Sequence, residues 1–187
     1  MTEKSLMTAT DELKAEHRII LKVLDAVERE IDAIARTGEV REDFVIKLLD
    51  FVRNFADACH HAKEEKRLFV KMSERGMPLN AGPLAVMLHE HEEGRRLVKA
   101  AADALAPALL GDKRALQALK DGLAGYVDLL RAHIGKEDNI LYPMADKMLT
   151  AEDQKTLAEA FERVEKVETG RGVHEKYHKL ADELARA

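Results

Sequence analysis

The sequence predicts an all-α protein, on the evidence of its composition, the spacing of its apolar residues and its few helix breakers. Alanine, leucine, glutamate and lysine dominate the 187 residues, and these residue types favour helices. Apolar residues recur at steps of three and four, the period of a helix with one buried face. Only four prolines interrupt the chain. The length fits one domain, or one domain with an appendage, with a sizeable core.

Four long amphipathic segments joined by short loops predict an antiparallel, up-down four-helix bundle. The first segment ends at Gly38, a residue that tolerates left-handed backbone. The third opens near Pro83, which suits a first helical turn, and is broken by Pro107 and Gly111. The predicted helices cover about residues 13–37, 41–74, 83–106 and 112–148.

Beyond the bundle, taken as residues 1–149, the chain predicts a helical extension over residues 150–187. The stretch "TAED" from Thr150 resembles a capping box, with aspartate in place of the usual glutamate or glutamine. A helix follows to about Glu168, "TGRG" breaks it, and a last short helix covers residues 173–186. We expect this extension to pack on the bundle rather than to form a domain.

Charge and hydropathy exclude several classes of function. The net charge is −5 with both signs interspersed, so no basic stripe indicates nucleic-acid binding. No apolar run has the roughly 18 residues of a membrane helix, and "MTEKSLMTATDELK" lacks the apolar core of a signal peptide. We therefore expect a soluble, cytoplasmic protein, either monomer or dimer. The single cysteine, Cys59, excludes an internal disulfide and is most simply a small buried residue.

The candidate functional residues lie in an internal sequence repeat. The stretch "HHAKEEKRLF", from His60, aligns with "HIGKEDNILY", from His133. The aligned pairs are Lys63 and Lys136, Glu64 and Glu137, Leu68 and Leu141, and Phe69 and Tyr142. In this alignment His61 falls opposite Ile134 and Glu65 opposite Asp138. The dipeptide "EH" also recurs, at Glu16-His17 and Glu90-His91. The chain therefore reads as two copies of one helix pair, each with E-H followed by H-x-x-x-E.

Helical geometry brings the repeated residues to one level. His60 and Glu64, four residues apart, share a helix face. His17 lies 22 residues before the first loop at Glu39 and His60 lies 21 after it, so both sit about 32 Å along antiparallel helices. Counting from the second and third loops places Glu64, His91 and His133 at similar distances along their helices. Six residues are therefore predicted to meet inside the bundle as metal ligands: His17, His60, Glu64, His91, His133 and Glu137.

A buried set of four imidazoles and two carboxylates carries an uncompensated desolvation cost unless a cation is present. Imidazole and carboxylate suit iron, zinc, manganese or copper. Two H-x-x-x-E motifs suggest two ions, with the carboxylates able to bridge them. Six ligands for two ions leave coordination positions open, which indicates reactivity rather than a purely structural site. Iron is the metal we expect, with manganese second and zinc possible.

With these motifs, the sequence resembles the hemerythrin-like proteins, the HHE cation-binding group, over about residues 11–147. It is most similar to the bacterial branch with the ordered pattern H, HxxxE, H, HxxxE. The resemblance implies a four-helix bundle around two non-haem iron ions with carboxylate and oxo- or hydroxo-type bridges. Oxygen carriers of the family have HxxxH on the third helix, but here Arg95 stands four residues after His91. The resemblance therefore implies oxygen or redox sensing, iron handling, peroxide removal or nitric-oxide chemistry rather than reversible oxygen carriage.

Other polar residues have simpler expected roles. We expect His61 and Glu65 to form a pair that is solvated or peripheral to the ligands, and Glu16 and Glu90 to be solvated or helix-pairing charges. His89 lies about 200° from His91 around its helix and should be on the surface.

Two further features leave a choice between packing and function. His174 and His178, in "HEKYH", could grip a metal but lie outside the repeat. Tyr126 and Tyr142 are expected to pack, with hydrogen bonding to the centre or ligation as the alternative.

Three functions compete. The first is a di-iron protein that binds or senses oxygen or a related diatomic. The second is an oxidoreductase of peroxidase or catalase type, or one consuming nitric oxide, built on the same centre. The third is iron storage and handling, or an interaction module stapled by metal without catalysis. Six ligands exceed the four that a closed zinc site needs, which disfavours the stapled module. The sequence does not separate the first two.

Overall fold

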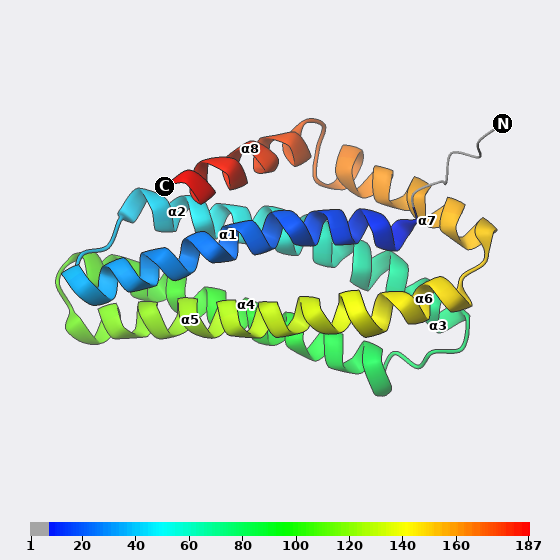
Figure 1. Ribbon diagram of the computed structural model, residues 1–187, viewed down its shortest axis with the longest axis horizontal. Coiled ribbons are helices and arrows are strands. Elements are labelled where there is room, and N and C mark those ends of the chain that lie inside the picture. Colours follow the sequence, from blue (N-terminus) through cyan, green and yellow to red (C-terminus); the bar gives the residue numbers. More distant parts are fainter. Residues whose placement is uncertain (1–7) are drawn as a thin grey trace.

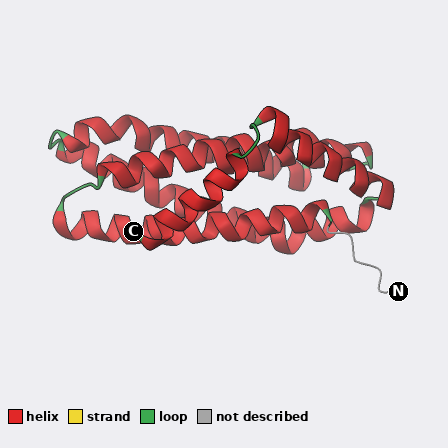
Figure 2. Cartoon of the chain, turned by 90° about the horizontal axis from the view of Figure 1, so that it is seen from above, coloured by secondary structure: helices red, strands yellow, loops and turns green. Residues whose placement is uncertain are grey.

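The computed structural model of the chain describes residues 8–187 and is helical almost throughout, as Figure 2 shows. The all-α prediction is confirmed. The start of the stretch that we used to argue against a signal peptide lies outside the described residues. The helices, in chain order, are α1 (Ala9–Thr37), α2 (Glu42–Phe51), α3 (Phe69–Glu74), α4 (Gly82–Leu109), α5 (Lys113–Lys136), α6 (Tyr142–Met148), α7 (Ala151–Arg163) and α8 (Val173–Arg186).

Two of the bundle's four long helices contain wide, π-helical turns. The second long helix runs from α2 to α3 through the π-helical segments η1 (Val52–His61) and η2 (Glu64–Leu68). The fourth runs from α5 to α6 through η3 (Glu137–Leu141). Both η2 and η3 begin at the glutamate of an H-x-x-x-E motif. Such turns are rare and frequently mark functional sites.

Local sequence signals set the helix ends. The Thr8 hydroxyl accepts a hydrogen bond from Asp11 N and the Asp11 carboxylate accepts one from Thr8 N, which makes a capping box for α1. Gly38, at φ 72°, ends α1 in the left-handed conformation that favours glycine. Asp112 caps α5 through Arg114 N and Ala115 N. Long helices and tight loops then stack α1, α2–α3, α4 and α5–α6 as an elongated bundle (Figure 1).

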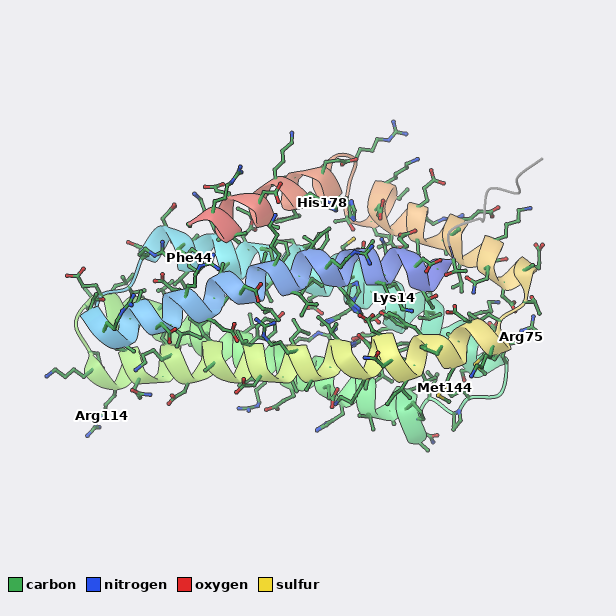
Figure 3. The ribbon with its side chains drawn as sticks, viewed as in Figure 1. Lys14, Phe44, Arg75, Arg114, Met144 and His178 are labelled. Carbon is green, nitrogen blue, oxygen red and sulfur yellow. The ribbon has the colours of Figure 1, made fainter. Side chains whose placement is uncertain are left out.

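The C-terminal extension lies along one side of this bundle, where α8 packs on α1 and α2 and α7 contacts α1 (Figure 1). The capping box predicted at Thr150 is present, with Asp153 as its acidic partner. Arg75, beyond the end of α3, donates two hydrogen bonds of 2.9 Å to Asp153 and ties the start of α7 to the bundle (Figure 3). Among the described residues, no helix is long and apolar enough to cross a lipid bilayer.

The hydrophobic core is divided into two clusters. The larger includes Leu24, Phe51 and Phe55, and lies toward the loops that follow α1 and α4. The smaller includes Phe69 and Phe161, and lies toward the other end of the bundle. Between the two clusters, the bundle buries polar side chains.

Candidate metal centre

The polar layer consists of two groups of buried donors that share one carboxylate. Within each group the donor atoms lie within 4.8 Å of one another. One group is His17, His60, Glu64 and Glu137, and the other is His61, Glu64, His91 and His133. The structure thus brings together all six residues expected from the repeat and adds His61. Their role as metal ligands stays a prediction that the geometry now allows us to examine.

The two glutamates have buried oxygens without hydrogen bonds. Among residues 8–187, neither oxygen of Glu137 has a hydrogen-bond partner, and Oε2 of Glu64 has none. Imidazole nitrogens nevertheless approach them: His17 Nε2 lies 3.2 Å from Glu137 Oε2, and His133 Nε2 lies 3.1 Å from Glu137 Oε1. Leaving such carboxylates unpaired in the interior is costly. A cation placed among these atoms would satisfy them, so the residues fit a metal.

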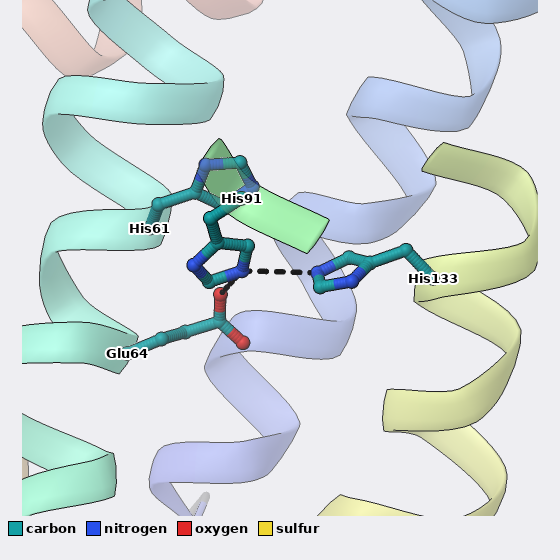
Figure 4. Close-up of side chains that lie close together, drawn as sticks. All are labelled: His61, Glu64, His91 and His133. Atoms are coloured by element: carbon teal, nitrogen blue, oxygen red, sulfur yellow. Dashed lines mark hydrogen bonds and ion pairs between the residues drawn. The ribbon is translucent and has the colours of Figure 1, made fainter. Parts of the chain in front are cut away.

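The facing imidazoles of His91 and His133 give a second indication. Their Nε2 atoms are 3.0 Å apart (Figure 4). Each ring has its Nδ1 atom at hydrogen-bond distance from a carboxylate, 2.7 Å from Glu65 Oε1 for His91 and 2.9 Å from Glu90 Oε2 for His133. A proton on Nδ1 leaves the lone pair on Nε2, so two lone pairs would face each other. A shared cation, or an additional proton, relieves that repulsion.

Each of the four predicted histidine ligands has a carboxylate at hydrogen-bond distance from its Nδ1 atom. The Nδ1–carboxylate pairs are His17 with Asp138 at 2.8 Å, His60 with Glu16 at 2.8 Å, His91 with Glu65 at 2.7 Å, and His133 with Glu90 at 2.9 Å. Metal-binding histidines almost always make such a bond, which fixes the tautomer and aims the other nitrogen at the ion. The arrangement is therefore typical of a metal centre.

Of the two roles expected for Glu16 and Glu90, solvated or helix-pairing charges, the helix-pairing role is the one found, since they pair with Lys63 and Lys136 of the neighbouring helices. Glu16 is only 2 % exposed, and both carboxylates orient histidines of the other helix in their repeat unit. Glu65 and Asp138, which the repeat aligns, orient His91 and His17 across the repeat. The sequence duplication thus repeats these hydrogen bonds as well as the predicted ligands.

The aligned lysines complete the repeat. Lys63 Nζ lies 2.7 Å from Glu16 Oε1, 2.7 Å from Glu12 Oε1 and 2.5 Å from Glu165 Oε1. Lys136 makes the corresponding ion pair with Glu90. The Lys63 side chain is fully buried, whereas that of Lys136 is 39 % exposed, because η4 (Val164–Glu168) of the extension covers only the first of them. The extension therefore touches the layer behind His60.

The electrostatics of the metal-free centre favour protonated imidazoles at His17 and His91. Burial opposes the charged form of His17, but the hydrogen bond to Asp138 and the contact with Glu137 raise its pKa to about 10. His91 is similar, since Glu64 and Glu65 outweigh burial and raise its pKa to about 10. Protons thus neutralise Glu64 and Glu137 where a metal would. Burial also raises the pKa of the Cys59 thiol to about 12, so it is unreactive near neutral pH.

His61 departs from the expected position. An ideal helix places it on the periphery, paired with Glu65, yet it is 5 % exposed and its ring stacks on His91 with centroids 3.9 Å apart. The reason is η1, whose π-helical turns are wider than α-helical ones, so that the angle per residue falls below 100°. The face of the helix therefore drifts, and His61 reaches the interior beside His60.

Of the two candidate tyrosines, Tyr142 contacts the donor groups and Tyr126 does not line them. Tyr142 is fully buried and its hydroxyl donates a 2.7 Å hydrogen bond to Glu64 Oε1, while lying 3.3 Å from His17 Nε2. Burial, with Glu137 and Glu64 nearby, holds the pKa of Tyr142 well above its usual value, so it stays a donor. Tyr126 instead lines a cavity of about 280 Å³ together with His61, Gly94 and Arg95.

The remaining histidines do not form a second centre of the expected kind. His174 Nε2 lies 3.1 Å from Glu16 Oε1, and the group it belongs to contains Glu16 and Glu165 rather than His178. Lys63 Nζ contacts both of these glutamates, so an ammonium group already neutralises them. The metal-gripping pair of His174 and His178 is therefore not supported. His89 is exposed, as expected.

The family model for the hemerythrin HHE cation binding domain matches residues 8–145. The chain belongs to this family. The match extends from the start of α1 into α6 and includes the whole donor set, and it confirms the resemblance seen in the repeat. The family description names a cation-binding domain, so a metal is the group for which this buried layer is suited.

Curated relatives divide into two kinds. The uncharacterized protein Mb2018 of Mycobacterium bovis is 24 % identical over 156 residues, which is 83 % of this chain and 60 % of the relative. The iron-sulfur cluster repair protein YtfE of Musicola paradisiaca is 36 % identical over 93 residues, covering 48 % of this chain and 41 % of the relative. YtfE of Edwardsiella ictaluri is 31 % identical over 102 residues. The chain thus spans less than two thirds of these relatives, and no solved structure matches it.

Proposed function

We propose that the chain is a non-haem iron protein whose centre holds two iron ions and reacts with, or senses, small oxidants: oxygen, peroxide or nitric oxide. The observation that carries the proposal is the pair of donor groups sharing Glu64, with oxygens of Glu64 and Glu137 left without hydrogen bonds between them. The ions would be held by the imidazoles of His17, His60, His91 and His133 and by the carboxylates of Glu64 and Glu137, of which Glu64 belongs to both donor groups. Iron bound in this way supplies redox chemistry and open positions for a small molecule.

The chain's own residues shape that chemistry. The carboxylates that accept hydrogen bonds from the imidazole Nδ1 atoms raise the basicity of the rings and fix their orientation. Tyr142 keeps a protonated hydroxyl beside Glu64 and supplies a hydrogen-bond donor at the centre. The buried apolar clusters on both sides exclude bulk water. These features suit a site that admits a diatomic or a peroxide and excludes larger substrates.

Iron handling is the second candidate, and the likeness to YtfE favours it. Those relatives are described as iron-sulfur cluster repair proteins. A protein of that kind would hold iron and release it to a damaged cluster, which requires exchangeable rather than permanent binding. Glu90 and Lys136 are partly exposed next to His133, so iron would be released on that side of the centre.

One set of measurements separates these candidates. Iron(II) is loaded anaerobically, bound metal is counted, and visible spectra are recorded on adding oxygen, hydrogen peroxide and nitric oxide. Two ions per chain with spectral changes and turnover of peroxide or nitric oxide would support reactivity with oxidants. Two ions without turnover, with transfer to an apo iron-sulfur protein, would support iron handling. Absence of stoichiometric metal binding would reject both.

A further inference from the structure

The extra imidazole in the metal layer is His61. It has no counterpart in the repeat, where Ile134 occupies the equivalent position. We propose that His61 is a seventh protein ligand of the centre and that its Nε2 atom binds the ion also held by His91, His133 and Glu64. This inference rests on the proposed two-metal centre and assigns a further residue to it.

Distance and burial place His61 with the ligands. A ring nitrogen of His61 belongs to the donor group that contains Glu64, His91 and His133. The His61 ring lies parallel to that of His91, with 15° between planes and 3.9 Å between centroids, and is 6.0 Å from the ring of His133 (Figure 4). Its side chain is only 6 % exposed. A histidine on the surface of the bundle would meet none of these conditions.

The orientation of His61 follows the same rule as that of the other ligands. Its Nδ1 atom faces Asp57 Oδ1 at 3.4 Å, so the ring is turned with Nε2 away from that carboxylate. Asp57 is itself held by Arg95, whose Nε and Nη2 atoms lie 2.9 and 2.7 Å from Oδ1. Arg95 also contacts Glu65, the carboxylate behind His91. One guanidinium thus positions the carboxylates behind both stacked imidazoles.

Counting donors shows what His61 changes. Without it, each ion has two imidazoles and the centre is symmetric: His17 and His60 for one ion, His91 and His133 for the other. With it, the second ion has three imidazoles. The third imidazole lies on the side of the centre that faces a cavity, because His61 lines a cavity of about 280 Å³ together with Arg95, Tyr126 and Gly94. The three-imidazole ion is therefore the one beside the cavity.

The test uses metal binding rather than activity. Cobalt(II), whose visible spectrum reports its ligands, is titrated anaerobically into the wild-type chain and into His61→Ala and His61→Met. Methionine keeps the volume and burial of the site but is a soft ligand that suits cobalt(II) poorly. His89→Ala removes an exposed histidine of the neighbouring helix and serves as the matched control. Circular dichroism and the unfolding curve of each metal-free variant verify the fold.

We expect both His61 variants to keep one tight ion and to bind the second at least about tenfold more weakly, since loss of a residue behind a ligand alone costs 10–100-fold. The spectrum of the second ion should change, and His89→Ala should match the wild type. Two ions bound to His61→Met with wild-type affinity and an unchanged spectrum would overturn the assignment. Failure of the wild-type chain itself to bind two ions would instead reject the proposed centre.

Discussion

The Nδ1 atom of His60 lies 2.8 Å from Oε2 of Glu16, a carboxylate contributed by the preceding helix and only 2 % exposed. The repeat reproduces this relationship between His133 and Glu90 at 2.9 Å. Each unit of the duplicated helix pair therefore contains a histidine oriented by its own carboxylate. The two pairs differ in burial, because the Glu90 side chain is 14 % exposed and Glu16 also bonds to Lys63 and His174.

Replacing Glu16 by glutamine should lower metal affinity by about 10–100-fold, because the amide is a weaker acceptor and no longer supports the ligand tautomer of His60. Glu90→Gln should act in the same direction on His133. Isothermal titration with iron(II) or cobalt(II) measures the effect. Glu159→Gln, on the exposed face of α7, is the control and should bind metal as the wild type does. Wild-type affinity in both Glu16→Gln and Glu90→Gln would show that these carboxylates do not orient ligands.

The aligned lysines offer a matched pair for stability. Lys63→Met leaves Glu16, Glu12 and Glu165 without their shared buried cation, and breaking a buried pair costs about 3–5 kcal/mol. Lys136→Met removes a partly exposed ion pair, worth at most about 1 kcal/mol. Urea unfolding of the metal-free proteins measures both free energies. If the two substitutions lowered the free energy of unfolding equally, burial of Lys63 by the extension would not strengthen its ion pairs relative to that of Lys136.

Much of the architecture could be predicted because it depends on repeated local signals. Apolar periodicity predicted the four long helices, and glycines and prolines predicted several of their ends. The six donors were found because they recur in register. This works where the chain follows an ideal helix, since residues four apart then share a face.

The remainder of the site depends on deviations from that ideal and on contacts between distant segments. His61 was misplaced because the π-helical segment η1 changes the angle between successive residues, and the sequence carries no clear mark of such a turn. Glu16 and Glu90 were expected to be solvated or helix-pairing charges, without contacts to histidines, because their neighbours in sequence do not reveal the imidazoles that face them. The contact of Glu165 with Lys63 joins residues 102 positions apart. Only the folded chain shows it.

The docking of the extension should depend on pH through Asp153. Hydrogen bonds from Arg75, and then from the Thr150 backbone, hold the pKa of the Asp153 carboxyl well below its usual value. A folded-state pKa below the unfolded one contributes stability above the ordinary pKa of about 4, and this is lost as the pH falls through the lowered value. The wild-type chain should therefore lose stability below about pH 4, and Asp153→Asn should lose less over that interval while being less stable at pH 7. Thermal unfolding at pH 7, 4 and 3 measures this, and parallel curves for the two proteins would contradict it.

Close packing of α4 against α5 should make Gly122 intolerant of a side chain. A Cβ there would lie 3.2 Å from the backbone nitrogen of Ala101 and 3.3 Å from the carbonyl oxygen of Leu97, neither of which can move alone. Gly122→Ala should cost about 1–3 kcal/mol through overpacking. Gly135→Ala, in the same helix but with nothing within 4 Å, should instead stabilise by about 0.5–1 kcal/mol. Chemical denaturation measures both, and stabilisation by both substitutions would show that the interhelical contact is loose.

Metal should stabilise the fold, and the effect should depend on Glu137. In the metal-free chain both oxygens of this fully buried carboxylate lack hydrogen bonds to residues 8–187, although the contacts with His133 and His17 outweigh burial and lower its pKa. A cation that binds the native state and not the unfolded chain adds about 2.7 kcal/mol at a free concentration 100 times its dissociation constant. Melting curves with and without iron(II), recorded anaerobically, should therefore differ by several degrees for the wild type. Glu137→Gln removes a carboxylate that we propose as a ligand, so iron(II) should shift its melting temperature much less than that of the wild type. An equal shift in both proteins would place the stabilising ion elsewhere.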